Sequence, residues 1–243
     1  MTTASPGRLA GRLALVTGAS RGLGAAAALA FAREGAHCVL VARTVGGLEE
    51  QDDKIKALGG SATLVPLDLT DGPGIDRLGA ALYERFGKLD VLLGNAAILG
   101  TLSPIGHVEP DTFDKVMAIN VTANWRLIRS LDPLLRRSDS GRAIFVTSGI
   151  AHKTVPYWSA YAASKAALEV LVGTYAAEVA HTAVRVNLYN PGPMRTAMRA
   201  QAFPGEDPET QTPPAAHAEG LVQLALPSCT MTGQWVAGDA ALT

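Results

Sequence analysis

The sequence predicts an α/β protein built on one doubly wound, parallel, seven-stranded sheet with helices on both faces. Short runs rich in Val, Ile and Leu alternate with longer Ala-rich stretches, which is the pattern of repeated βαβ units. Most of the short runs are apolar throughout, as in Val39–Val41 and Val91–Leu93, and such strands need helices over both faces. The chain of 243 residues suits one domain of this class, spanning 1–243.

The strands and helices follow one another in a regular order. We expect strands at about 12–17, 36–42, 62–66, 89–93, 142–147, 183–188 and 233–237. The helices between them are expected at about 22–34, 44–58, 73–86, 111–137, 157–180 and 215–226. A ligand of such a sheet binds at the carboxyl ends of the strands, near the point where the strand order reverses.

One stretch, at about 194–214, interrupts this order. It lacks a long periodicity and is rich in breakers, namely Pro204, Gly205, Pro208, Pro213 and Pro214. Because it directly follows Asn190-Pro191-Gly192, we expect a mobile substrate lid, with an ordinary long surface loop as the alternative.

Composition excludes several other classes. With 21 Lys and Arg against 22 Asp and Glu, the net charge of −1 argues against a nucleic acid or an anionic membrane as partner. The 48% of hydrophobic residues argue against disorder. Cys38 and Cys229 are far apart and form no metal-binding pair, so neither a disulfide framework nor a metal site is expected. Met1–Gly11 lacks the apolar core of a signal peptide, and no run is long enough to span a membrane, so we expect a cytoplasmic protein.

The first predicted strand runs into a glycine-rich turn before an Ala-rich helix, as in Rossmann-like dinucleotide sites. The turn comprises Gly18, Ser20, Arg21, Gly22, Leu23 and Gly24. Glycines let the backbone approach a diphosphate, and the positive end of the helix attracts its charge. The strand–turn–helix setting favours a nucleotide site over a merely structural tight turn.

The end of the second strand indicates which cofactor binds. An NAD site usually has a carboxylate there, but this chain has Ala42 and Arg43. Arg43 and Arg21 suit the extra phosphate of NADP, although both could instead be solvated surface residues. Asp68, after the third strand, could accept from the adenine amino group or could cap the next helix.

Three candidate catalytic residues follow the fifth predicted strand. Ser148 ends that strand, and Tyr161 and Lys165 lie four residues apart on one face of a helix. A phenol has a pKa of about 10, and a nearby ammonium and a cationic nicotinamide both favour its phenolate form. An isolated pair of this kind would more simply be a surface pair, but this helix is largely apolar and follows a nucleotide-binding sheet.

These pieces, in order, resemble the short-chain dehydrogenase/reductase family in its single-domain type, over about residues 10–237. The matching segments are 17–24, Asp68-Leu69, Asn95-Ala96, Asn120, Ser148, 161–165, and Asn190-Pro191-Gly192 with Thr196. Within the family, residues 190–200 followed by Phe203-Pro204 and 206–208 are most similar to the YciK-like bacterial oxidoreductases.

The resemblance implies an NADP(H)-dependent oxidoreductase that interconverts a ketone or aldehyde and an alcohol. Tyr161 would be the general acid and base, and Ser148 would hold the substrate oxygen. Lys165 would lower the pKa of Tyr161 and bind the nicotinamide ribose, and Asn120 would hold a water that relays protons. Further cofactor contacts would come from Leu69, Asn95, Ala96, Ala97, Pro191, Gly192 and Thr196. The family also implies a homodimer or homotetramer formed through the helices near 111–137 and 157–180.

Two segments depart from the family pattern. Gly94-Asn95-Ala96-Ala97 stands where Asn-Asn-Ala-Gly is usual, so that Ala97 could crowd the adenosine ribose. The segment 232–240 lacks the usual final pair of glycines, which puts contacts of the C-terminal segment in doubt.

Several large side chains are candidates for the substrate pocket, and they favour a substrate with a sizeable apolar or ring portion. They are His152, Val155, Trp158, Met194, Met198 and Phe203. Packing at a subunit contact is an equal alternative for Trp158 and Tyr157. The competing function is a nucleotide-sensing regulatory protein on the same fold that binds NADP without turnover, but such a protein has no need to retain Asn120, Ser148, Tyr161 and Lys165 together.

Overall fold

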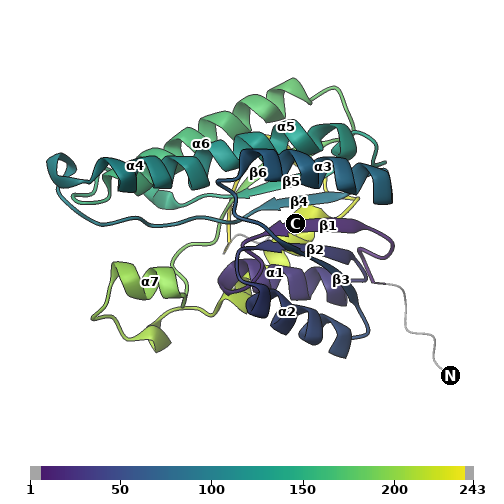
Figure 1. The fold of residues 1–243 in the computed structure, drawn as a ribbon, viewed down its shortest axis with the longest axis horizontal. Helices are drawn as coiled ribbons and strands as arrows, with labels where there is room; N and C mark the ends of the chain where they lie inside the picture. Colours follow the sequence, from purple (N-terminus) through teal and green to yellow (C-terminus); the bar gives the residue numbers. More distant parts are fainter. Residues whose placement is uncertain (1–6, 239–243) are drawn as a thin grey trace.

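The computed structural model describes residues 7–238, and it confirms the predicted fold class. Seven parallel strands form one sheet in the order β3-β2-β1-β4-β5-β6-β7, so the order reverses between β1 and β4 (Figure 1). The strands are β1 Leu13–Thr17, β2 His37–Ala42, β3 Ser61–Pro66, β4 Val91–Gly94, β5 Arg142–Val146, β6 Arg185–Asn190 and β7 Trp235–Ala237. Their bounds lie within about two residues of those expected.

Helices cover the sheet in two layers (Figure 1). One layer contains α1 Gly22–Arg33, α2 Val45–Ala57 and α8 Ala218–Ala225, and the other contains α3 Gly72–Phe86, α5 Ala123–Leu135 and α6 Ser159–Glu178. Each layer packs its apolar face on the sheet, as Phe31 does on one side and Leu127 and Leu168 do on the other; all three are fully buried. The double cover explains why the strands are apolar along their whole length.

The helix expected over 111–137 is interrupted. It divides into α4 Pro110–Met117, a π-helical turn Ala118–Thr122, and α5. The buried side chain of Asn120 leaves this turn to bond the backbone of Ile98 at both its N–H and its carbonyl, each at 2.9 Å. A wide turn of this kind shifts the helical register, and such turns are frequent at functional sites.

The segment expected to be a lid is folded. It contains α7 Ala197–Ala202 and 3-10 turns at Pro208–Thr210 and Pro214–His217. Thr196 caps α7, because its hydroxyl accepts from the N–H of Arg199. Of the helices within residues 7–238, none has the length and apolar character needed to cross a bilayer.

Candidate active site

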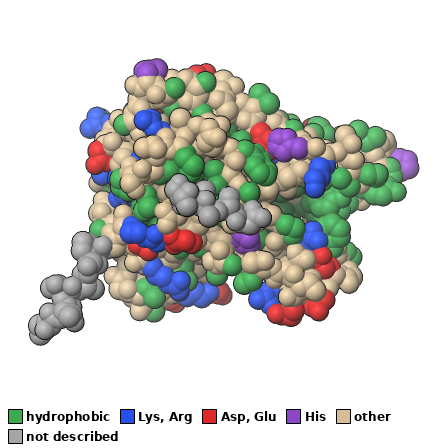
Figure 2. All heavy atoms as spheres, turned by 180° about the vertical axis from the view of Figure 1, so that it is seen from behind, with side chains coloured by type: hydrophobic (Ala, Val, Ile, Leu, Met, Phe, Trp, Pro, Cys, Tyr) green, Lys and Arg blue, Asp and Glu red, His purple; other side chains and the backbone are tan. Residues whose placement is uncertain are grey.

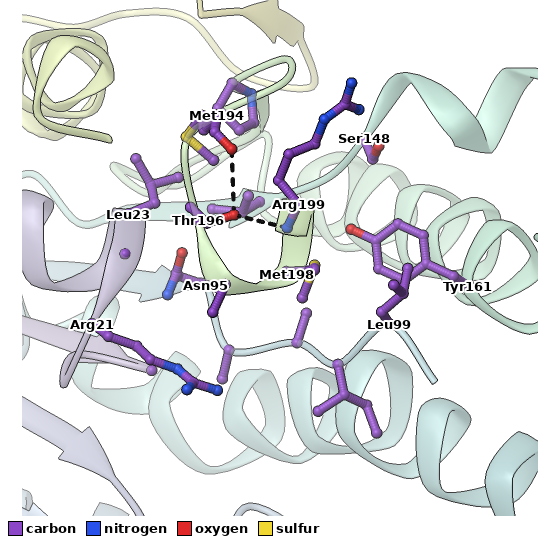
Figure 3. A pocket seen from close by; sticks show the side chains of 18 of the residues that line it. Arg21, Leu23, Asn95, Leu99, Ser148, Tyr161, Met194, Thr196, Met198 and Arg199 are labelled. Atoms are coloured by element: carbon purple, nitrogen blue, oxygen red, sulfur yellow. Dashed lines mark hydrogen bonds between the residues drawn. The ribbon is translucent and has the colours of Figure 1, made fainter. Parts of the chain in front are cut away.

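A cavity of about 1040 Å³ lies at the carboxyl ends of the strands, beside the switch between β1 and β4. Figure 3 shows Arg21 and Leu23 on one side of it, Ser148 and Tyr161 on the opposite side, and Thr196 and Met198 between them. From behind, the molecule has a recess between the projecting start of α4 and the lobe that holds α7, and hydrophobic side chains border it (Figure 2). One pocket therefore joins the two groups of residues that the sequence singled out.

Most of the predicted cofactor residues line this cavity. They are Gly18, Ser20, Arg21, Gly22, Leu23, Arg43, Asp68, Leu69, Asn95, Ala96, Ala97, Tyr161, Lys165, Pro191, Gly192 and Thr196. Gly24 does not line it but lies beneath the turn, where an added Cβ would stand 2.4 Å from the carbonyl oxygen of Gly18 and 2.5 Å from Nδ2 of Asn95.

The glycine-rich turn has the shape that a dinucleotide needs. Gly18 and Gly22 have φ angles of 66° and 59°, in the left-handed region that favours glycine. Asn95 ties the end of β4 to the end of β1, because its Nδ2 donates to the carbonyl of Thr17 at 2.8 Å. The open backbone and the start of α1 thus form a cradle that fits a diphosphate.

The adenosine side of the pocket carries Arg21, Arg43 and Asp68. Nη1 of Arg43 lies 4.0 Å from Oδ2 of Asp68. A hydrogen bond from the N–H of Thr70, assisted by the Thr70 hydroxyl and by Arg43, holds the pKa of Asp68 below its ordinary value. Asp71, and not Asp68, caps α3, so the capping alternative for Asp68 is wrong.

Ser148 and Tyr161 meet at the opposite side of the pocket. Ser148 follows β5, and Tyr161 comes from the first turns of α6. Burial raises the pKa of Tyr161 to about 12, while a hydrogen bond with the Ser148 hydroxyl acts in the opposite direction. The lowering of the Tyr161 pKa expected from Lys165 is not found in the protein alone, where burial and the Ser148 hydroxyl set the pKa.

Lys165 lies one turn below Tyr161 and is buried. Its Nζ donates to the carbonyl of Val146 at 2.8 Å and lies 5.7 Å from the centre of the Tyr161 ring. Burial lowers the pKa of Lys165 to about 8, and the charge of Glu169 works against that lowering. The ammonium is therefore tied to the last residue of β5, beside Ser148.

Asn120 is close to these residues but is not part of the cavity wall. Its Nδ2 donates to Oγ of Ser164 at 3.0 Å, and that hydroxyl donates to the carbonyl of Tyr161. Its own carbonyl accepts from Nδ2 of Asn124 at 2.9 Å. Asn120 thus links the π-helical turn to the first turns of α6. The water relay assigned to Asn120 stays a prediction.

Asn124 is not singled out by the sequence. Gly94, however, stands where the family usually has asparagine, and the structure relates this glycine to Asn124. A Cβ added at Gly94 would lie 2.4 Å from Cδ1 of Phe145 and 2.6 Å from Oδ1 of Asn124. The space that the family's usual asparagine side chain would need at position 94 is therefore occupied by the buried side chains of Phe145, from β5, and Asn124, from α5.

Five of the six residues expected in the substrate pocket line the cavity: Val155, Trp158, Met194, Met198 and Phe203. The rings of Trp158 lie 6.1 Å from Tyr161 and 5.8 Å from Phe203, centre to centre. The structure does not place His152 with them. Its Nε2 lies 2.9 Å from Oε2 of Glu169, and its ring packs edge-on against Trp235, so it is turned away from the pocket.

The segment 194–214 contributes residues to the wall of the pocket, and Figure 3 shows Thr196 and Met198 between its two sides. On the cofactor side, Cγ2 of Thr196 is 3.7 Å from the place that a Cβ of Gly22 would take. On the substrate side, the Arg199 guanidinium lies 3.8 Å from the centre of the Phe203 ring and forms two hydrogen bonds with Glu206. Nε2 of Gln201 also donates to the carbonyl of Gly100, after β4, at 3.0 Å.

The C-terminal departure from the family pattern concerns β7. Residues 232–238 are described, while Asp239 and Ala240 lie outside the described residues. Gly238 reaches the pocket side of β6, since its N–H donates to the carbonyl of Asn190 at 2.7 Å.

Known proteins resemble this chain over most of its length. The family model described as short chain dehydrogenase matches residues 12–207. The uncharacterised oxidoreductase YciK of Escherichia coli K12 is 38% identical over 207 residues, covering 84% of this chain and 82% of that protein. A protein of Pseudomonas syringae described as a short-chain dehydrogenase has 40% identity and a TM-score of 0.93, with 98% of both chains covered. A structure from Shigella flexneri 2a, solved as a complex with NADP, has 35% identity and a TM-score of 0.93, with 97% of this chain and all of the other covered.

The family model covers most of the chain, and the glycine turn, Ser148, Tyr161 and Lys165 lie in one pocket. The chain therefore belongs to the short-chain dehydrogenase family, as a YciK-like oxidoreductase.

Proposed function

We propose that the protein uses NADP(H) to interconvert a carbonyl compound and an alcohol, with Tyr161 as the general acid and base. The observation that carries the proposal is the single cavity that holds the glycine turn and two arginines at one side and Ser148 with Tyr161 at the other. Such a separation of the two groups suits a cofactor whose phosphates and reacting ring lie far apart.

The preference for NADP over NAD rests on charge at the adenosine side. Arg21 and Arg43 line the pocket where β2 ends, and the strand end itself offers Ala42 in place of a carboxylate. Guanidinium groups bind phosphate with charge-assisted, often bidentate, hydrogen bonds. The Shigella flexneri relative solved with NADP agrees with this choice.

Substituting either arginine tests the preference. We expect Arg21→Ala and Arg43→Ala each to weaken NADPH binding by about 10- to 100-fold, since a hydrogen bond to a charged group contributes about 1.5–3 kcal/mol. NADH binding should change by less than about threefold, because NADH lacks the phosphate. Fluorescence titration with each cofactor measures both constants.

Arg33→Ala is the matched control, because Arg33 is exposed at the far end of α1. Tighter binding of NADH than of NADPH by the unmodified protein would contradict the assignment, and so would an equal loss for both cofactors in the variants.

The reacting side chains have separate tasks in the reduction. When bound, NADPH supplies a hydride to the carbonyl carbon and is left with a positively charged nicotinamide. Tyr161 gives its phenolic proton to the carbonyl oxygen, and Ser148 holds that oxygen with a second hydrogen bond. Lys165 favours the phenolate that results, because its ammonium lies 5.7 Å from the ring. Oxidation of the alcohol reverses each step, and Asn120 would hold the water through which the proton is restored.

The substrate side favours a ketone, aldehyde or secondary alcohol with an apolar or ring portion. Trp158, Met198 and Phe203 supply most of its apolar surface. The segment 194–214 would act as the lid, since Phe203 belongs to it and packs against Trp158.

The helices α5 and α6 offer a surface for a second copy of the chain. A groove between them is lined by Trp125 and Val170, whose residues are 44% and 73% exposed. Exposed apolar side chains that share a groove favour a subunit contact. We propose that the protein forms a homodimer or homotetramer through this groove.

A charged residue in the groove should separate the subunits. We expect Val170→Arg to convert an oligomer to a monomer in light scattering. The new charge would join Arg129 and Arg136, which already line the groove, and burying an additional like charge at the contact is costly. Leu58→Arg, at the exposed end of α2 in the other layer, is the control and should leave the mass unchanged. A monomeric mass for the unmodified protein would contradict the proposal.

A further inference from the structure

Glu169 is a nearly buried carboxylate one helical turn beyond Lys165. Its side chain is 12% exposed, and each of its oxygens has a partner from another element. Oε1 accepts from the hydroxyl of Thr147 at 2.6 Å and from the indole N–H of Trp235 at 3.1 Å. Oε2 lies 2.9 Å from Nε2 of His152.

The contact with Thr147 holds the chain just after the end of β5. Thr147 lies between Val146, whose carbonyl accepts from Lys165, and Ser148, which faces Tyr161. The carboxylate on α6 therefore fixes the residue next to both contacts, and it joins α6 to the end of β5, to the 3-10 turn Gly149–His152 and to β7. A shift of this strand end would move the Ser148 hydroxyl and the support of Lys165 together.

Glu169 also supplies negative charge near the lysine, and it acts against the effect of burial on the pKa of Lys165. Of the described residues, His152 from the preceding turn contacts the carboxylate directly, and Lys165 lies one turn earlier on the same helix. The other two partners, Thr147 and Trp235, do not titrate in the working range.

Three other elements packed against α6 bring titratable groups, but these are engaged or exposed. On α5, Asp132 accepts from the Tyr175 hydroxyl of α6 and from Arg136. On β6, Arg185 donates to the carbonyls of Thr182 and Val184, and Tyr189 donates to that of His217. On α4, the titratable side chains are exposed: Asp111, Asp114 and Lys115. Glu169 is thus the carboxylate that acts on Lys165.

We propose that Glu169 is a positioning residue that ties the end of β5 to α6 and keeps Lys165 in its charged form. The proposal rests on the function proposed for this site. His152 and Trp235 support Glu169 from the outer side, which gives His152 a task behind the pocket instead of within it.

The charge is tested by the titration of Lys165 itself, which needs no turnover. Protein labelled with ¹³C at lysine Cε is titrated by NMR, and a Lys165→Met variant assigns the signal. We expect Glu169→Gln to move this titration to lower pH by on the order of one unit, because the amide keeps an acceptor for Thr147 but removes the charge. Glu84→Gln, on an exposed position of α3, should leave it unchanged. An unchanged Lys165 titration in Glu169→Gln overturns the proposal.

The positioning effect is tested by Thr147→Val, which removes one donor with little change of shape and leaves the carboxylate in place. With NADPH and phenanthrenequinone as the probe carbonyl, we expect kcat to fall by about fivefold or more while the KM for NADPH stays unchanged. Wild-type kcat in this variant overturns the positioning role, and if Glu169→Gln does not fold, Thr147→Val alone decides. Failure of the unmodified protein to reduce any carbonyl would refute the proposed function, while the Lys165 titration would still report on Glu169.

Discussion

Replacing Tyr161 by Phe is expected to lower turnover by about a thousandfold, while NADPH binds with unchanged affinity. General acid catalysis contributes about 10²–10⁴-fold. Among the described residues the other acid near Ser148 is the Lys165 ammonium, which is engaged with the carbonyl of Val146. The phenol is buried, and losing one hydroxyl leaves the arginines and the glycine turn in place. Absorbance of the nicotinamide follows turnover in a screen of carbonyls, and fluorescence titration follows binding.

Tyr157→Phe is the matched control, since Tyr157 is exposed, lies four residues earlier and does not line the pocket. Its turnover should equal that of the unmodified protein. Turnover that survives in Tyr161→Phe would assign the acid to another group. Tight NADPH binding without turnover of any carbonyl or alcohol by the unmodified protein would favour the nucleotide-sensing alternative.

Restoring the usual asparagine at Gly94 is expected to destabilise the protein by about 2–4 kcal/mol. Overpacking of a well-filled core costs about 1–3 kcal/mol or more, and an amide brought in without a partner adds to the cost. The new Cβ alone would lie 2.4 Å from Cδ1 of Phe145, a distance that no real Cβ tolerates. Urea denaturation followed by circular dichroism gives the change in the free energy of unfolding.

Gly46→Asn is the control, because a Cβ at Gly46 meets nothing within 4 Å. We expect it to change the free energy of unfolding by less than about 0.5 kcal/mol, in the stabilising direction if at all, because asparagine has a slightly higher helix propensity than glycine. Adding Asn124→Ala to Gly94→Asn should recover part of the loss, since it removes the amide whose Oδ1 lies 2.6 Å away. A Gly94→Asn protein as stable as the unmodified one would show that Phe145 and Asn124 can move aside.

The sequence predicts the sheet and the glycine turn because both depend on local patterns. Apolar runs such as Val39–Val41 specify strands buried on both faces, and the strand–turn–helix order places Gly18 at a dinucleotide site. The pairing of Tyr161 with Lys165 follows from helical periodicity, and the fold brings both to Ser148.

What the sequence misses depends on contacts between distant segments. His152 lies between Ser148 and Tyr161 in the sequence, which favours a place in the pocket. Its ring is held outside the pocket by Glu169 and Trp235, which lie 17 and 83 positions further along the chain. The π-helical turn at Ala118–Thr122 has no periodicity of its own, and its Asn120 is bonded to the backbone of Ile98, in a segment distant in the sequence. The pKa of Tyr161 is set by burial, which no spacing of residues reveals.

The two residues that flank the short helix α7 reach opposite halves of the pocket, Thr196 at the glycine turn and Phe203 at Trp158. Two ligands that each stabilise one folded arrangement of a shared segment are linked thermodynamically, and the linkage is reciprocal. If bound cofactor raises the affinity for substrate by some factor, bound substrate must raise the affinity for cofactor by the same factor. A substitution in α7 that loosens this segment is therefore expected to reduce the factor by which each ligand raises the affinity for the other, even where both separate affinities survive.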